Sequence, residues 1–149
     1  MKERFRTLLL ATLVIVTGGL VFAADAPKQK VVGIGGLFFK AEHPKELAAW
    51  YETNLGISLT PTAMGQEPWH QEAGPTVFAP FKKETKYFGK PEQMWMVNFR
   101  VADLKAMMAQ LRAAGIKVEE EGSDPSGDFA RLEDPEGNPI QLWQPAKAK

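Results

Sequence analysis

The chain has no cysteine among its 149 residues, and this absence excludes disulfide bonds, thiolate metal sites and lipid attachment at an N-terminal cysteine. Histidine is also scarce: the only two are His43 and His70, and their spacing fits no zinc pattern. No Gly-x-Ser-x-Gly nucleophile elbow occurs either. The folded domain must therefore be held together by its core alone.

Charge is missing from residues 7–24, which follow the basic residues Lys2, Arg4 and Arg6. This apolar run ends in small residues and predicts a secretory signal peptide over residues 1–23, which would send the protein to the periplasm of a Gram-negative host. The alternative is a retained membrane anchor, because about 18 uncharged residues reach the lower limit for a spanning helix. We expect contact with a membrane only through this segment, and only if it is not cleaved.

Net charge is absent as well, since 18 basic residues balance 18 acidic ones. Removal of the signal peptide would take three basic residues and one acidic residue, leaving 15 and 17. A nearly neutral chain without a basic patch argues against a nucleic-acid partner. The remaining residues, about 125, are enough for a single domain.

The mature chain reads as a flexible lead-in over residues 24–30 and a domain over residues 31–145 that contains two similar units. In each, a β-prone segment precedes an amphipathic helix that ends at a Gly-Ile pair, and Gly56 and Gly115 lie 59 residues apart. Module one covers about residues 31–90 and module two about 94–145. The strands expected in module one are residues 31–41, 57–60, 76–81 and 87–88. In module two we expect strands at 95–101, 129–132 and 140–143, and a further strand that begins at 116–118. Residues 121–127 are expected to form a loop.

The C-terminal run DPEGNPIQLWQP, residues 134–145, combines a tight turn with a strand. Side chains alternate along a strand, so Gln141 and Trp143 should share one face while Ile140 and Leu142 share the other.

Three segments together resemble the vicinal oxygen chelate superfamily, the glyoxalase and bleomycin-resistance proteins. They are GGLFFKAEHPKELAAWYETNLGI, MVNFRVADLKAMMAQLRAAGIKV and GDFARLEDPEGNPIQLWQP, in this order. The resemblance implies an α+β fold of paired βαβββ modules that form a curved sheet around a cleft, and a homodimer.

In metal-dependent members of that superfamily, four side chains on inward-facing strands hold a divalent ion. The resemblance places these positions at Gly36, within residues 76–80, at Met96 and at Gln141. None of them offers a carboxylate or an imidazole, which a hard cation requires. We therefore expect no catalytic metal or other cofactor.

A cleft of this kind would bind a small organic ligand through polar contacts and aromatic walls. Each candidate also has a plain alternative: the aromatic residues fill the core, Asn98 is a satisfied core asparagine, and Arg131 pairs with Glu133 or Asp134. The ligand-binding candidates are Phe38, Trp69, Met96, Asn98, Phe129, Arg131, Gln141 and Trp143.

Two functions of different classes fit this sequence. The first is an exported binding module that takes up a small ligand without a metal. The alternative is a glyoxalase-like lyase or isomerase, or a dioxygenase-like enzyme, with an unrecognised site. His70 would be its acid–base candidate, and as a plain alternative His70 is a solvated loop residue. An interaction domain with a vestigial cleft is a third possibility.

Overall fold

The computed structural model describes residues 30–147 of the chain. Within these residues, all helices and strands lie in the unit that begins at Phe38. The predicted signal peptide, residues 1–23, and residues 24–29 of the lead-in lie outside the described residues. Among the residues that the structure describes, no helix is long and apolar enough to cross a membrane.

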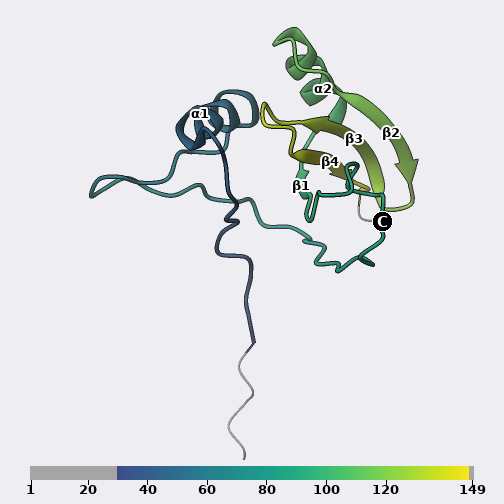
Figure 1. Cartoon of the computed structure of the whole chain (residues 1–149), viewed down its shortest axis with the longest axis horizontal. Helices are drawn as coiled ribbons and strands as arrows, with labels where there is room; N and C mark the ends of the chain where they lie inside the picture. The colour runs from purple at the N-terminus through teal and green to yellow at the C-terminus, as the bar shows by residue number, and fades with distance from the viewer. Residues whose placement is uncertain (1–29, 148–149) are drawn as a thin grey trace, which may run out of the picture. The chain divides into compact units, whose positions relative to one another are not determined.

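The second half of the chain forms a complete βαβββ module, as the sequence predicts. Its four strands make one curved sheet in the order β1-β4-β3-β2, in which β1 runs parallel to β4 and the other neighbours are antiparallel (Figure 1). The α+β class is thus confirmed. The elements are β1 (Val97–Arg100), α2 (Leu104–Ala113), β2 (Glu119–Asp124), β3 (Gly127–Glu133) and β4 (Pro139–Pro145).

In module one, the structure has the predicted helix but none of the predicted strands. Helix α1 (Pro44–Leu55) begins with a proline in its first turn and ends at Gly56, whose φ of 69° is left-handed. Between residues 30 and 96, no segment pairs as a strand. A strand exists only through hydrogen bonds to a neighbour. Three glycines interrupt residues 31–41, and a proline, which lacks an N–H donor, interrupts residues 76–81. The apolar pattern alone therefore predicted too much structure.

Two boundaries in module two also differ from expectation. The strand expected to begin at 116–118 begins at Glu119, because the Ile116 N–H still donates to the Leu111 carbonyl at the end of α2. Residues 121–124, expected in a loop, belong to β2, and only the turn at 125–126 interrupts the pairing with β3. Charged residues are common on a strand at the edge of a sheet, and β2 is such an edge strand.

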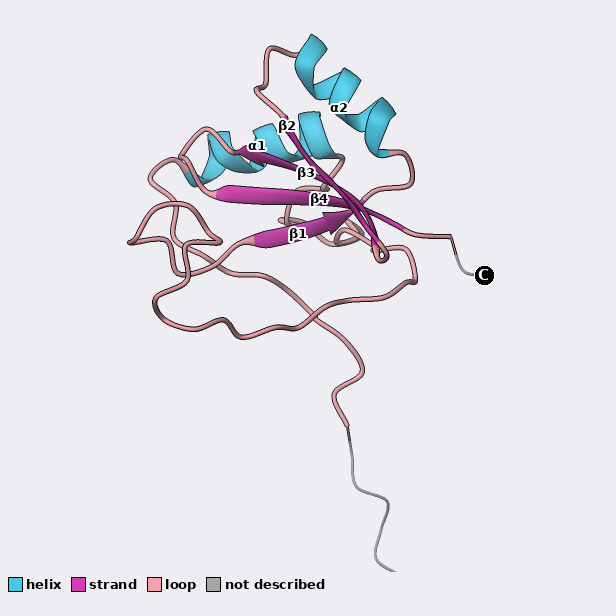
Figure 2. Cartoon of the chain, turned by 90° about the vertical axis from the view of Figure 1, so that its right-hand side faces the viewer, coloured by secondary structure: helices cyan, strands magenta, loops and turns pink. Residues whose placement is uncertain are grey.

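The core lies between one face of the sheet and the two helices. Both helices lie on this side of the sheet (Figure 2). Ile140 and Leu142 of β4 are fully buried there, together with residues of α1 and α2. Gln141 and Trp143 alternate with them and face the other side, as the sequence predicts. The core consists of Leu47, Tyr51, Leu104, Met108, Leu111, Val118, Ala130, Leu132, Ile140 and Leu142.

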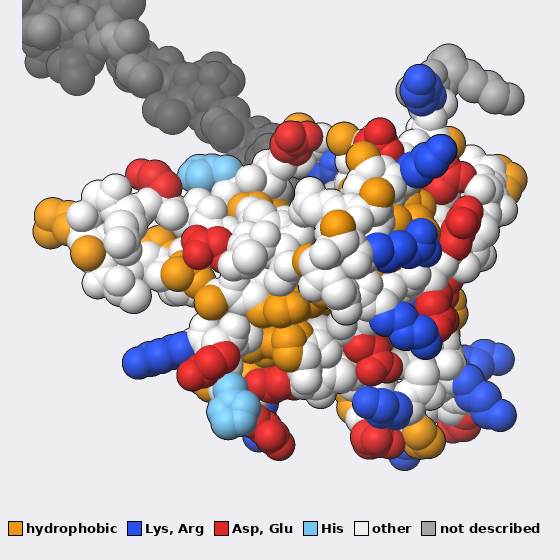
Figure 3. All heavy atoms as spheres, turned by 90° about the horizontal axis from the view of Figure 1, so that it is seen from above, with side chains coloured by type: hydrophobic (Ala, Val, Ile, Leu, Met, Phe, Trp, Pro, Cys, Tyr) orange, Lys and Arg blue, Asp and Glu red, His pale blue; other side chains and the backbone are white. Residues whose placement is uncertain are grey.

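Hydrophobic side chains also reach the surface of the described residues, as Figure 3 shows for one face of the molecule. The large exposed ones all precede β1. From β1 onward, the large hydrophobic side chains are buried or half-buried by the sheet and the helices. The exposed members from Phe38 onward are Phe38, Phe39, Leu59, Met64, Trp69, Val77, Phe78, Phe81, Tyr87 and Met94.

The Asp134 carboxylate connects helix α1 to the turn between β3 and β4. Asp134 is only 5% exposed and accepts four hydrogen bonds. The Tyr51 hydroxyl donates one at 2.9 Å, and the others come from the Glu136 N–H and from both amide groups of Asn138 at 2.8–2.9 Å. Burial of the Tyr51 phenol, with the nearby Asp134 charge, raises the pKa of Tyr51 above its ordinary value, so the phenol remains a donor.

Loss of this donor should weaken the fold. We expect Tyr51→Phe to lower the free energy of unfolding by about 1.5–3 kcal/mol, because a buried carboxylate loses one of its partners. Urea denaturation followed by circular dichroism measures the change. Tyr87→Phe is the matched control and should cost less, because the Gln141 amide that donates to Tyr87 also donates to Glu121. Equal stability of Tyr51→Phe and the unaltered protein would contradict this role of Asp134.

Candidate functional site

Three polar side chains lie in one row across the sheet, on the face turned away from the helices. Asn98 of β1 is in register with Gln141 of β4, which is in register with Arg131 of β3. Residues opposite each other on neighbouring strands point to the same side. Gln141, in the middle, is 5% exposed, whereas Asn98 is open to solvent.

The Gln141 amide uses all of its polar atoms within this row. Its Oε1 accepts from Asn98 Nδ2 at 2.7 Å, and its Nε2 donates to the Tyr87 hydroxyl and to Glu121 Oε2, both at 2.7 Å. A carboxylate can only accept, so Glu121 sets the orientation of the amide. Gln141 is thus a buried polar group with satisfied hydrogen bonds, rather than a free ligand to a metal.

Arg131 pairs with Glu121 and not with Glu133 or Asp134, the partners expected by default. Its Nε lies 2.7 Å from Glu121 Oε1, and the two side chains are only 23% and 28% exposed. The Nε–H has no well-directed hydrogen bond among the described residues, so the contact acts through charge. Arg131 Nη1 also donates to the Tyr87 carbonyl at 2.6 Å, and the guanidinium lies 4.9 Å from the centre of the Tyr87 ring. Arg131 is therefore already occupied by groups of the protein.

Glu121 is the member of the site that the sequence interpretation missed. Glu119–Glu121 reads as a solvated acidic run, but the register of β2 against β3 shifts between Glu120 and Gly122. This β-bulge leaves Glu121 outside the regular pairing, and its side chain reaches Gln141 and Arg131. The sequence did contain a sign of this bulge, which is Gly122, because a glycine within a strand often marks a bulge. In the structure, Gly122 has a φ of 92°.

An aromatic pair lies in the next row of the same face. Trp143 and Phe129 are in register and stack with ring centres 6.3 Å apart and planes 3° apart. The indole Nε1 of Trp143 donates to the Ser126 carbonyl at 3.0 Å, and Trp143 is 9% exposed. Five of the eight ligand-binding candidates therefore lie together: Asn98, Phe129, Arg131, Gln141 and Trp143.

The other candidates lie apart from these rows. Phe38 is 93% exposed, and Trp69 packs edge-on against Phe99, which alternates with Asn98 and so faces the other side of β1. Met96 is half-buried just before β1. The His70 imidazole is exposed on its loop, with Nε2 3.6 Å from Glu67 Oε2. The structure thus does not bring His70 to the Gln141 row.

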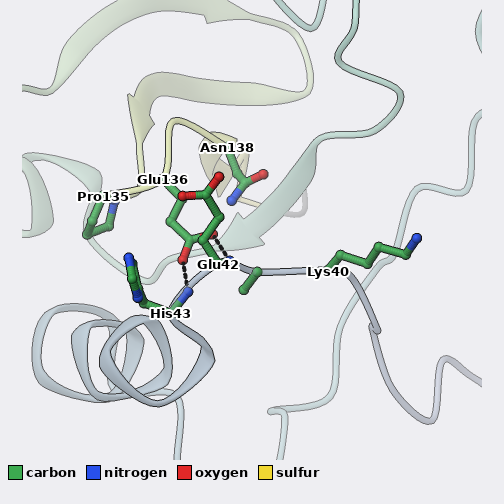
Figure 4. Close-up of a pocket in the computed structure, with 7 residues that line it drawn as sticks. Lys40, Glu42, His43, Pro135, Glu136 and Asn138 are labelled. Atoms are coloured by element: carbon green, nitrogen blue, oxygen red, sulfur yellow. Dashed lines mark hydrogen bonds between the residues drawn. The ribbon is translucent and has the colours of Figure 1, made fainter.

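Two pockets, of about 550 and 470 Å³, lie beside the start of α1 rather than over the Gln141 row. Both are bordered by His43, Pro135 and Glu136. Figure 4 shows the larger of the two. The Glu136 carboxylate accepts from the backbone N–H groups of His43 at 2.8 Å and Glu42 at 3.0 Å. These bonds lower the pKa of Glu136 below its ordinary value. His43 itself makes no side-chain capping bond, and Glu136 instead binds the two backbone N–H groups that immediately precede α1.

The donors around Gln141 do not fit a divalent metal ion. The carboxylate that reaches Gln141 is Glu121, which the positively charged Arg131 already neutralises. The rest of the row supplies neutral amide and phenol groups. Among the residues that the structure describes, no three His, Cys, Asp or Glu side chains form a metal-binding group. A hard cation prefers several carboxylate or carbonyl oxygens and would be repelled by the guanidinium.

The model of the glyoxalase-like domain family matches residues 36–143 of the chain. The chain belongs to this family, within the vicinal oxygen chelate superfamily. Similar solved structures include an antibiotic-binding protein from Streptomyces sp. CB03234, with 25% identity over 68% of this chain and 87% of that one and a TM-score of 0.45. A glyoxalase family protein from Bacillus anthracis has 17% identity over 68% and 84% of the two chains, with a TM-score of 0.44. No curated protein matches the chain.

Proposed function

We propose that this glyoxalase-like domain binds a small organic ligand on the sheet face that carries Asn98, Gln141 and Trp143, and that it does so without a catalytic metal. The observation that supports this proposal is the satisfied Gln141 amide, held between an exposed asparagine and a stacked aromatic pair. Binding sites typically combine apolar walls with a few fixed polar groups.

Two polar groups of this row remain available to a ligand. Asn98 donates to Gln141 through Nδ2, and within the described part of the chain its Oδ1 accepts no hydrogen bond. The Tyr87 hydroxyl accepts from Gln141 and keeps its own proton to donate. A planar molecule with one donor and one acceptor would match these groups and the neighbouring aromatic rings.

Binding without chemistry is the function that these groups support best. Glu121 would be a general base, but its charge is shared with Arg131 and with the Gln141 amide. An enzymatic alternative, a lyase or isomerase, would rely on His70, which lies on an exposed loop beside Glu67. A general base must lie within hydrogen-bond reach of the proton that it removes, and His70 is not part of the Gln141 row.

The proposal can be tested with 2-naphthamide, a planar neutral probe, by isothermal titration calorimetry. We expect Asn98→Ala to weaken its binding about 2- to 12-fold, because one hydrogen bond contributes about 0.5–1.5 kcal/mol. Asn54→Ala, on helix α1, is the matched control and should bind like the unaltered protein. EDTA should change neither affinity. Equal binding by Asn98→Ala would refute the site, and loss of binding in EDTA would refute its metal-free character.

We also propose that the protein is exported with residues 1–23 removed and that it forms a homodimer. The hydrophobic residues exposed in module one, such as Phe38, Val77 and Phe78, support the dimer, because apolar surface left in water costs about 25 cal/mol per Å². The uncharged N-terminal run behind three basic residues supports the export.

Native mass spectrometry of the protein purified from its host tests both proposals at once. We expect the mass of a dimer of chains that begin at Ala24, with divalent metal at background level. A monomer would contradict the homodimer, and an intact N-terminus would contradict cleavage. One bound metal ion per chain would contradict the absence of a metal.

A further inference from the structure

We call the sheet face that carries Asn98, Gln141 and Trp143 the ligand face, after the binding proposed above. One arginine on this face, Arg100, contacts an exposed segment of the chain. Arg100, at the end of β1, donates through Nη2 to the Glu72 carbonyl at 2.7 Å and through Nη1 to the Ala73 carbonyl at 3.4 Å. It shares the face of Asn98, two residues earlier, and is in register with Trp143. The next residue, Gly74, lies so close that a Cβ added there would collide with Arg100 Nη1.

We name residues 67–80 the strap, because they have neither helix nor strand and every one of them is exposed. Within the described part of the chain, no backbone–backbone hydrogen bond begins or ends in the strap. Its contacts with the sheet are the two bonds from Arg100 and the edge-on packing of Trp69 on Phe99. Segments with so few contacts open at low free-energy cost.

The charge of Arg100 is not neutralised in this arrangement. Among the described residues Arg100 forms no ion pair, and both of its acceptors are neutral carbonyls. Arg131, the other arginine on this face, differs because Glu121 balances its charge. A guanidinium can bind a carboxylate through two parallel hydrogen bonds between opposite charges, which a neutral carbonyl oxygen does not offer. The carbonyls of Glu72 and Ala73 therefore occupy a position that an anionic group would fill better.

We propose that Arg100 determines specificity for a ligand that carries a carboxylate, and that this carboxylate replaces the Glu72 and Ala73 carbonyls and releases the strap. The inference rests on the proposed function, because the rest of the ligand must lie against Asn98 and Trp143. The register permits this, since Arg100 and Trp143 are on neighbouring strands about 4.8 Å apart. The ligand class is then an aromatic carboxylic acid rather than a neutral aromatic compound.

The affinity of two nearly isosteric probes tests the specificity. By isothermal titration calorimetry, we expect 2-naphthoate to bind the full mature chain at least about tenfold more tightly than 2-naphthamide. Arg100→Gln should abolish this preference, and Arg100→Lys, which keeps the charge without the two parallel donors, should retain part of it. Lys105→Gln removes a positive charge from the exposed face of α2 and should change nothing.

Proteolysis tests the release of the strap, because a protease specific for glutamate cleaves at the Glu72 carbonyl that Arg100 holds. Cleavage after Glu72 should be about tenfold faster in Arg100→Gln than in the unaltered protein, and saturating 2-naphthoate should accelerate it only where Arg100 is present. Gly74→Ala provides a second variant that keeps Arg100 intact. Its added methyl group would overlap the Arg100 guanidinium, so the strap and the guanidinium must separate. This separation should speed cleavage, while the preference for 2-naphthoate remains.

The outcomes separate this inference from the proposed function. Equal affinity for 2-naphthoate and 2-naphthamide, with binding still dependent on Asn98, would overturn the role of Arg100 and leave the binding face intact. Tighter binding of 2-naphthoate to the unaltered protein, with cleavage after Glu72 no faster when 2-naphthoate is added, would overturn the release of the strap. Failure of both probes to bind the unaltered protein would overturn the inference together with the proposed function.

Discussion

The arrangement of this domain depends on the buried carboxylate of Asp134. A buried charge is costly unless hydrogen bonds compensate it, and here the turn supplies three donors and Tyr51 of α1 the fourth. Glu136 adds a second connection by accepting from the two backbone N–H groups that immediately precede the same helix. The helix is thereby held on the side of the sheet where Ile140 and Leu142 are buried, and the side of Gln141 and Trp143 is left for other contacts.

The short C-terminal run thus has two separate roles. Its turn, with Asp134 and Glu136, is structural, and the pockets beside α1 adjoin a site that Glu136 already occupies. Its strand carries the polar and aromatic side chains of the ligand face. The position that would hold a metal in metal-dependent relatives is Gln141, whose amide is committed to Asn98, Tyr87 and Glu121. Family membership therefore gives the scaffold, while these contacts support our proposal that the domain binds a ligand without a metal.

Local chemistry predicted much of this structure, and partners distant in sequence were what it missed. Asp103 caps α2 through a hydrogen bond to the Ala106 N–H, and Gly56 and Gly115 end the helices in left-handed conformation, because each depends only on nearby residues. The strands of module one were predicted wrongly, because pairing requires a neighbour that no local pattern specifies. In the site, the alternation along β4 was sufficient to place Gln141 and Trp143. Two contacts, in contrast, could not be predicted from local patterns. Arg131 meets Glu121 because of the bulge in β2, and Arg100 binds a loop that is distant in sequence.

Nuclear magnetic resonance spectra can show whether a ligand binds on the face of Asn98, Gln141 and Trp143. The side-chain amide signals of Gln141 and Asn98 are the best probes, because both groups lie on that face. On titration with 2-naphthamide, we expect the signals of both side-chain NH₂ groups to shift progressively. The backbone amide signals of Glu42 and His43, whose N–H groups donate to Glu136, should not shift. Shifts confined to Glu42, His43 and Asn138, with the Gln141 and Asn98 signals unchanged, would place the ligand in the pocket beside α1 and contradict the account.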